Sequence, residues 1–375
     1  MNAIPKSVAP ALRLLLGPGP SPVDPRVLDA LSRPTLGHLD PAFLAIMDEV
    51  RDMQRALFNT SNELTFPMSG TGSAGMETCL VNTIEPGDRV LVAVNGVFGT
   101  RLAEVARRAR AEVTTVDFEW GQPVTPDAVR SAAGDGQFKA LCVVHAETST
   151  GVLSDVAALR PVADDLGALL IVDCVTSLGG LPVRLDDWGV DAAYSGTQKC
   201  LSCPPGLSPV SLSPRAQAAL AARKSPVQSW SLDLSLIGSY WGAERAYHHT
   251  APINMIYGLH EALRLAHEEG LEQRFARHAA AAAELYSRLE ALGLELLVAP
   301  ESRLAPLTSV RVPAGIDEAA VRSSLLADHD IEIGGGLGPL KGAIWRIGLM
   351  GHGATRENAV LVAGALEQAL AAQRG

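Results

Sequence analysis

The chain has 375 residues, with 31 basic and 41 acidic side chains and a formal net charge of −10 at pH 7. We expect neither nucleic acid nor an anionic membrane as a partner, because both require clustered basic residues and the basic residues here are scattered. A chain of this length exceeds the size at which a single core usually stops growing, so two domains are expected.

No uninterrupted apolar run approaches the length that crosses a bilayer. The apolar stretch near the amino end is split by Arg13 and is followed by no small-residue cleavage site, so no signal peptide is expected. Five cysteines, most of them in or beside apolar runs, are typical of a reduced protein, and we therefore expect a cytoplasmic location. Cys200 and Cys203 form a single CxxC without a second pair at zinc spacing, so neither a metal site nor a redox role is favoured.

The first part of the chain alternates between strand-like and helix-like segments. Residues 1–12 contain prolines and no periodicity, which predicts an N-terminal arm. Short β-branched runs then recur between segments of helix length, and the expected strands are 89–94, 112–118, 140–145, 168–174, 192–196 and 208–213. This alternation predicts an α/β fold, in which a large domain over 13–268 has a mostly parallel sheet between helices.

From about Pro252 the sequence changes to long helical patterns. Residues 253–270 and 271–293 repeat apolar side chains at three- and four-residue spacing, and each segment ends in glycine. Two expected strands, 309–313 and 344–349, flank a helix over 317–329, and a last helix covers 355–372. These elements predict a smaller α+β domain over 269–375.

Asp173 and Lys199 follow two neighbouring expected strands, 26 residues apart, which leaves room for one loop and one short strand. Ligands of such sheets bind at the carboxyl ends of the strands. A lysine held in an apolar turn can lose its proton and form a Schiff base, because burial disfavours its charged form. An acid beside it can keep a pyridine nitrogen protonated. The pair indicates pyridoxal phosphate, while a surface lysine and a turn-forming aspartate stay open as local alternatives.

Three further features could belong to the same site. The segment SGTGSAGMETCL places small residues before a helical run, so free amides and the hydroxyls of Thr71 and Ser73 could hold a phosphate. It fits neither the Walker A nor the GxGxxG pattern, and a purely structural turn is the alternative. Phe98 could stack on a flat ring or belong to the core. Arg346, a charged residue in an apolar strand, could bind a carboxylate or form a structural ion pair.

These residues, in this order, resemble the class V family of fold-type I pyridoxal phosphate enzymes, and closely the alanine-glyoxylate and serine-pyruvate aminotransferase group. The similarity runs nearly end to end through the segments GPGPSPVDPRVL, SGTGSAGMETCLVN, EPGDRVLVAVNGVFG, HAETSTGVL, VDCVTSLGG, YSGTQKCLSCPPG, YHHTAPINMIYGL, IEIGGGLG and WRIGLMGHGATREN. The resemblance implies the fold-type I architecture. It also implies a ping-pong aminotransferase that moves the amino group of a small amino acid, alanine or serine, to glyoxylate or pyruvate.

The resemblance also implies roles for residues around the cofactor ring. Lys199 would form the Schiff base and carry the proton, and Asp173 would pair with the pyridinium nitrogen. Phe98 would stack on the ring, where relatives often have Trp. Thr148 would lie near the ring hydroxyl, and Val175 under one ring face.

Phosphate and substrate positions are implied in the same way. The phosphate positions of the family match Thr71, Gly72, Ser73 and Gln198, and relatives often have His in place of Ser73. Tyr247 and Thr250 would reach the same phosphate from a second subunit, which implies a homodimer with shared active sites. The substrate positions are Arg346, which would bind the carboxylate, Gly19, His38 and Asn254.

Three alternatives to this activity were considered. Ureidoglycine as the amino donor stays open, because His38 and Asn254 occupy places that vary with the donor. Cysteine desulfurases, lyases of the same architecture, need a reactive cysteine in the last third of the chain, whereas the last cysteine here is Cys203. A protein that binds the cofactor only for regulation or scaffolding would need neither Lys199 nor Arg346.

Overall fold

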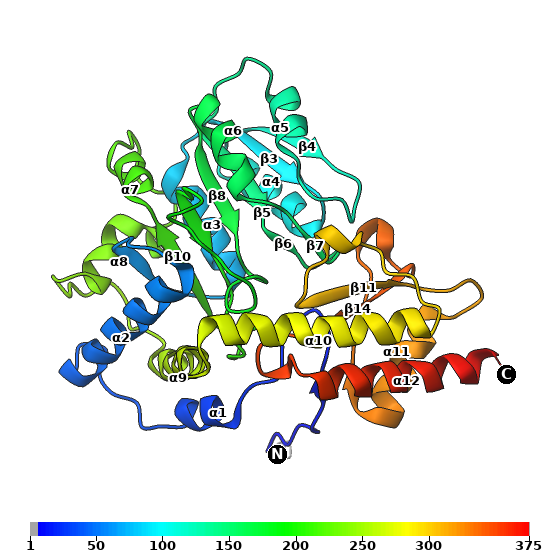
Figure 1. Ribbon diagram of the computed structural model, residues 1–375. Helices are drawn as coiled ribbons and strands as arrows, with labels where there is room; N and C mark the ends of the chain where they lie inside the picture. Colours follow the sequence, from blue (N-terminus) through cyan, green and yellow to red (C-terminus); the bar gives the residue numbers. More distant parts are fainter. Residues whose placement is uncertain (1–6, 375) are drawn as a thin grey trace, which may run out of the picture.

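The computed structural model describes residues 7–374, in which two main clusters of buried apolar side chains define two packed regions (Figure 1). Residues 1–6 of the expected arm lie outside the described residues, and residues 7–12 are exposed without regular structure. Within the described part of the chain, no helix is both long enough and apolar enough to span a bilayer.

The larger region contains a seven-stranded sheet with the strand order β2, β10, β9, β8, β5, β3, β4. Its strands are β2 (Leu64–Ser69), β3 (Arg89–Val94), β4 (Glu112–Asp117), β5 (Ala140–Val144), β8 (Leu169–Asp173), β9 (Ala192–Tyr194) and β10 (Leu207–Leu212). Neighbours from β9 to β4 are parallel, whereas β10 is antiparallel to both β9 and β2. The predicted mostly parallel sheet is confirmed, with each expected strand within two residues of its observed bounds.

Strand β2 is not among the strands that the sequence predicts. Pro67 interrupts its apolar run and cannot donate a hydrogen bond to a neighbouring strand. The structure tolerates this proline because β2 lies at the edge of the sheet, where only β10 pairs with it. Strands β5 and β8 are buried along their whole length, which accounts for their continuous apolar sequences.

Helices surround this sheet and form the crossovers between its parallel strands (Figure 1). They are α1 (Pro25–Leu31), α2 (Pro41–Phe58), α3 (Gly72–Thr83), α4 (Val97–Arg108), α5 (Pro126–Ala133), α6 (Arg160–Asp165), α7 (Pro214–Ala221), α8 (Leu234–Trp241) and α9 (Ile253–Glu269). Single 3-10 turns lie at η1 (Ala157–Leu159) and η2 (Trp230–Leu232), and a short hairpin joins β6 (Ala146–Glu147) to β7 (Val152–Leu153). Helices α1 and α2 pack against α9.

The smaller region packs two long helices on a three-stranded antiparallel sheet of order β11, β14, β13. In Figure 1, α10 (Leu271–Ala291, yellow) and α12 (Arg356–Arg374, red) lie side by side, and the two helices are in contact. The other elements are β11 (Leu307–Arg311), α11 (Glu318–His329), β12 (Ile331–Glu332), β13 (Gly334–Gly335), β14 (Ile344–Gly348) and the turns η3 (Pro300–Ser302), η4 (Gly338–Leu340) and η5 (Gly351–Gly353). The four helices predicted after Pro252 are all present.

The amino-terminal segment joins the smaller region. Strand β1 (Leu14–Leu15) pairs in parallel with β12, and Leu16 is fully buried in the smaller apolar cluster. The expected large domain over 13–268 would place this strand with the other core. Leu16 fills an apolar site beside β12, and the expected boundary at residue 13 stays a prediction. The remaining division at residue 269 stays a prediction.

Candidate active site

A cavity of about 310 Å³ lies at the carboxyl ends of the parallel strands. Nine of the residues selected from the sequence line it together, although they come from five separate parts of the chain. They are Gly19, Thr71, Gly72, Ser73, Phe98, Asp173, Val175, Gln198 and Lys199. The topology therefore brings together side chains whose motifs are far apart in the sequence.

Lys199 lies almost completely buried in this cavity, with 7% of its surface exposed. Its amine donates a hydrogen bond to the carbonyl of Pro18. Burial, reinforced by the positive charge of Arg346, lowers the pKa of Lys199 from 10.5 to about 8. An amine with a pKa this close to neutrality can act as a nucleophile and can carry a proton.

Gly19 allows the chain to pass directly over this lysine. Its φ is +107°, and a Cβ at this position would lie 2.7 Å from Cδ of Lys199. Any other residue would be strained in this conformation and would displace the lysine. At Gly19, a predicted substrate position, the backbone thus passes close to the reactive amine of Lys199.

Asp173 ends β8 and is held by two donors. Its Oδ1 accepts a hydrogen bond from the amide of Val175 at 2.8 Å, and its Oδ2 accepts one from the hydroxyl of Tyr194 at 2.7 Å. Burial raises the pKa of Asp173 to about 6, and both hydrogen bonds oppose this rise. The carboxylate is therefore ionised at neutral pH, as required to pair with a protonated ring nitrogen.

Tyr194 was not selected from the sequence, although it lines the cavity. It lies directly opposite Asp173 in the register of β8 and β9. A tyrosine at the end of the short apolar run beside the aspartate strand was the available signal. Its hydroxyl holds the carboxylate of Asp173 in place. This contact exists because β8 and β9 are neighbours in the sheet, which the sequence does not reveal.

The amino end of α3 forms a cradle for an anion. Thr71 is the N-cap residue, and its side chain makes no capping hydrogen bond, so the first amides of the helix are free to bind a ligand. A Cβ on Gly72 would lie 3.3 Å from Cγ2 of Val175, so a glycine keeps this corner open. The carboxamide oxygen of Gln198 is buried without a partner among the described residues, which leaves this side chain available to a ligand.

Two apolar side chains, Phe98 and Val175, line the same cavity. The guanidinium of Arg101 lies 4.9 Å from the centre of the Phe98 ring. The cavity thus combines an acid, a near-neutral lysine, an anion cradle and apolar surfaces for a flat ring. This donor set fits pyridoxal phosphate, with Asp173 for the ring nitrogen and α3 for the phosphate.

Arg346 is buried in β14 near the lysine, with 6% of its surface exposed. Its Nε donates to the carbonyl of Gly335 at 2.8 Å, and its Nη1 donates to the carbonyl of Thr148 at 3.1 Å. Burial lowers the pKa of Arg346 to about 10. The guanidinium pairs with no carboxylate in residues 7–374, so the structural ion pair considered as an alternative is not formed within them. Its Nη2 is left for a ligand.

Asn254 does not reach the cavity in this chain. Its side-chain nitrogen donates to the carbonyls of Leu31 at 2.9 Å and Arg33 at 2.7 Å, and its oxygen accepts a hydrogen bond from Thr35 at 2.6 Å. The carboxamide is fully used in fixing this loop to α9. Within one chain, Asn254 therefore fixes this loop, and the expected substrate contact stays a prediction.

His38, Tyr247 and Thr250 also lie away from the cavity wall. The rings of His38 and Tyr247 are 5.1 Å apart, and Tyr247 is 63% exposed. Tyr247 and Thr250 lie on the loop between α8 and α9. Their exposure is compatible with the expected contact to a second subunit, which stays a prediction.

The thiols of Cys200 and Cys203 are buried beside the lysine turn. Cys200 donates a hydrogen bond to the carbonyl of Thr176 at 3.1 Å. Burial raises the pKa of both thiols to about 12, so both are protonated and unreactive at neutral pH.

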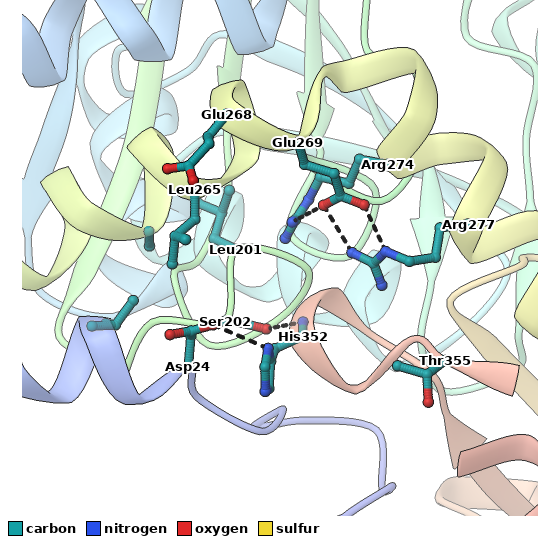
Figure 2. Close-up of a pocket in the computed structure, with 12 residues that line it drawn as sticks. Asp24, Leu201, Ser202, Leu265, Glu268, Glu269, Arg274, Arg277, His352 and Thr355 are labelled. Atoms are coloured by element: carbon teal, nitrogen blue, oxygen red, sulfur yellow. Dashed lines mark hydrogen bonds and ion pairs between the residues drawn. The ribbon is translucent and has the colours of Figure 1, made fainter. Parts of the chain in front are cut away.

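A second cavity, of about 440 Å³, is lined by Leu201 and Ser202, which follow Lys199 in the chain (Figure 2). Ser202 of this turn accepts a hydrogen bond from the amide of His352 in η5 at 2.7 Å. Glu269 pairs with Arg274 at 2.9 Å and with Arg277 at 2.6 Å, at the junction of α9 and α10. Glu269 thus holds both arginines of α10, and Arg274 and the amide of His352 link the smaller region to the lysine turn.

Comparison with known proteins agrees with this geometry. The family described as Aminotransferase class-V matches residues 14–347. The (S)-ureidoglycine–glyoxylate transaminase of Bacillus subtilis is 41% identical over 377 residues, covering 96% of this chain and 91% of that protein. The alanine–glyoxylate aminotransferase of Rattus norvegicus is 42% identical over 373 residues, covering 98% and 90%. The crystal structure of an alanine–glyoxylate aminotransferase from Nostoc sp. matches with a TM-score of 0.97 and 48% identity, over 98% of both chains. The chain therefore belongs to the class-V aminotransferases, pyridoxal phosphate-dependent enzymes of fold type I, as its sequence predicted.

Proposed function

We propose that this aminotransferase moves the amino group of a small amino acid, alanine or serine, to glyoxylate or pyruvate in a ping-pong reaction. The observation that carries the proposal is the Arg346 guanidinium, which forms no ion pair within residues 7–374 and lies close enough to Lys199 to depress the pKa of its amine. An arginine there can bind the carboxylate that donor and acceptor share. The relatives from the rat and from Nostoc, named as alanine–glyoxylate aminotransferases, support this choice.

The residues of the chain divide the work. Bound pyridoxal phosphate supplies the electron sink. Lys199 carries the proton between the α-carbon of the substrate and the cofactor, because the pKa of its amine is near neutral pH. Asp173 keeps a negative charge beside the ring nitrogen, and Arg346 orients the substrate by its carboxylate.

The size of the cavity favours a donor with a short side chain. Its volume of about 310 Å³ must hold the cofactor, and the substrate must fit between this cavity and Arg346, which does not line it. This value is at the lower end of the range usual for small-molecule sites. Alanine, serine and glyoxylate fit such a site better than long amino acids do.

Ureidoglycine is the second candidate for the donor. The relative from B. subtilis, named as an (S)-ureidoglycine–glyoxylate transaminase, is about as similar to this chain as the rat enzyme. The two names share glyoxylate and differ in the donor. The lyase alternative has less support, because all five cysteines are buried and Cys203 is the last of them.

We also infer a homodimer with shared active sites, located in the cytoplasm. Exposed Tyr247, on the loop that also carries Thr250, supports the first inference, since neither residue serves its own cavity. The buried free cysteines support a reducing compartment.

The test is a visible spectrum of the purified holoenzyme, to which L-alanine, L-serine and ureidoglycine are added separately without acceptor. We expect a band at about 400–430 nm that is lost fastest with alanine or serine as the amino group passes to the cofactor. Fastest loss with ureidoglycine would establish the second candidate. A band that none of the three moves would overturn both proposals.

A further inference from the structure

Glu147 is a buried acid next to the cofactor cavity to which no role has been given. It ends β6 and is completely buried. Its Oε1 accepts hydrogen bonds from the amide and the hydroxyl of Ser149, at 3.0 and 2.6 Å. Its Oε2 accepts hydrogen bonds from the amides of Phe98 and Gly99, at 3.1 and 3.4 Å. Both oxygens are thus used by donors.

This set of partners favours an ionised carboxylate. All four partners donate a hydrogen bond to it. Two of them are the first free amides of α4, where the positive end of the helix dipole favours an anion. Burial raises the pKa of Glu147, and the four hydrogen bonds oppose this rise.

Glu147 caps α4 from another part of the chain. Gly96, at the N-cap position, has no side chain to bind the first amides of the helix. A Cβ on Gly96 would collide with the Glu147 carboxyl group. The hydroxyl of Ser149 accepts the remaining hydrogen bond, from the amide of Val97 at 3.0 Å. The acid and the serine together replace the missing cap.

The capped turn carries the aromatic side chain of the cavity. Phe98 is the second residue of α4, and its own amide is bound by Glu147. The residue after the acid, Thr148, accepts a hydrogen bond from Arg346. The charge of Glu147 also raises the pKa values of Lys199 and Arg346, against the effect of burial. One carboxylate therefore acts on the ring wall and on both cations.

We infer that Glu147 is a positioning residue that fixes Phe98 against the cofactor and holds a negative charge near Lys199 and Arg346. The inference rests on the family's use of pyridoxal phosphate and not on the identity of the amino donor. It extends the site to an acid that does not line the cavity.

The test compares Glu147→Gln with the wild-type protein. Glutamine has nearly the same size, but its nitrogen cannot accept a hydrogen bond and it carries no charge. We expect about tenfold weaker binding of pyridoxal phosphate to the cofactor-free protein, because hydrogen bonds to a charged group are lost. In the loaded protein, the pH midpoint of the visible cofactor band should fall, because the positive charge at Lys199 loses a nearby anion. The other charges that act on this lysine, Asp173 and Arg346, are unchanged.

Ser149→Ala separates positioning from charge. It removes one donor to Glu147 and the acceptor for Val97 but keeps the carboxylate. We expect weaker cofactor binding with a midpoint near that of the wild-type enzyme. This variant also keeps the test decisive if Glu147→Gln fails to fold, since unchanged cofactor affinity in Ser149→Ala would overturn the positioning role.

Glu85→Gln is the matched control. Glu85 also accepts hydrogen bonds from backbone amides and a serine hydroxyl, from Lys224 at 3.0 Å and from Ser225 at 2.9 and 2.6 Å. It lies beyond the carboxyl end of α3, whose amino end lines the cavity. We expect wild-type affinity and midpoint. If Glu147→Gln matched this control in both measurements, the inference would be wrong, whichever donor the enzyme uses.

Discussion

The amine of Lys199 is buried, and at neutral pH its positive charge destabilises the folded protein without cofactor. Desolvation is the largest cause of its lowered pKa, and Arg346 adds to the effect. Asp173 has the opposite shift, to about 6, for the same reason. Burial thus brings the pKa values of Asp173 and Lys199 closer to each other and to neutral pH. Proton transfer between substrate and cofactor is most efficient when the pKa of the catalytic group is near the working pH.

The pKa of Lys199 predicts a pH dependence of stability. Between pH 8 and 10.5 the unfolded chain binds more protons at this lysine than the folded chain, so its contribution to the free energy of unfolding rises with pH. Below pH 8 the penalty is complete. We expect Lys199→Met to stabilise the cofactor-free protein by about 2 kcal/mol at pH 7 and to remove this rise.

Urea unfolding of the cofactor-free protein at pH 7 to 10.5 measures this difference. Replacement of an exposed lysine, Lys341→Met, is the control and should leave the pH profile unchanged. Parallel profiles for Lys199→Met and the wild-type protein would show that the amine is not desolvated as described.

At the scale of elements, the site depends on turns that leave strands and on the close approach of backbone to side chains. The first turns of α3 and α4 present free or externally capped amides, and both follow strands of the central sheet. Long periodic helices and continuous apolar strands were predictable because their patterns extend over many residues. Strands β1, β12 and β13, of two residues each, are too short to show any period.

Gly19→Ala tests the close approach at the lysine. Both the positive φ and the 2.7 Å distance from a Cβ to the lysine Cδ oppose any side chain there. We expect a loss of about 2 kcal/mol in stability and a lower fraction of bound cofactor, measured by urea unfolding and by absorbance. Gly364→Ala in α12 is the control, since a Cβ there meets nothing within 4 Å. It should raise stability by about 0.5–1 kcal/mol. Equal effects of the two changes would contradict the geometry.

At the scale of the whole molecule, buried polar contacts join the two regions at the lysine turn. Arg274 of α10 donates to the carbonyls of Gly179 at 2.8 Å and Cys200 at 2.6 Å, while Glu269 neutralises its charge. Ser21, from the amino-terminal segment, donates to the carbonyl of Lys199 at 2.7 Å. The position of the lysine is therefore set by segments from both ends of the chain.

Arg274→Ala should destabilise the protein by about 3 kcal/mol, because two buried carbonyls lose their donor and Glu269 loses one of its partners. Arg288→Ala, which breaks an exposed pair with Glu284, is the control and should change stability by less than about 0.5 kcal/mol. Thermal unfolding of the holoenzyme distinguishes the two. A loss for Arg274→Ala as small as for the control would mean that the buried link contributes little.

Shared active sites predict complementation between inactive subunits. Lys199→Ala lacks the amine, and a Tyr247→Ala/Thr250→Ala double variant lacks the phosphate contacts proposed for its partner. A mixed dimer would contain one complete site, so unfolding and refolding the two together should restore about a quarter of wild-type activity. Each variant refolded alone is the control. No recovery, with mixed dimers present, would show that the sites are not shared.

The parts of the site that follow local patterns could be predicted from the amino-acid sequence. Asp173 ends a strand, the cradle of α3, Phe98 and Lys199 each follow one within a few residues, and the topology of parallel strands collects such positions at one edge. Tertiary structure alone decided the contacts between segments far apart in the chain. Examples are the capping of α4 by Glu147, the hydroxyl of Tyr194 on Asp173, the hydrogen bond from Arg346 to the carbonyl of Thr148 and the docking of β1 on the smaller region. These contacts depend on strand order and on which buried groups find partners, and no local pattern of residues encodes either.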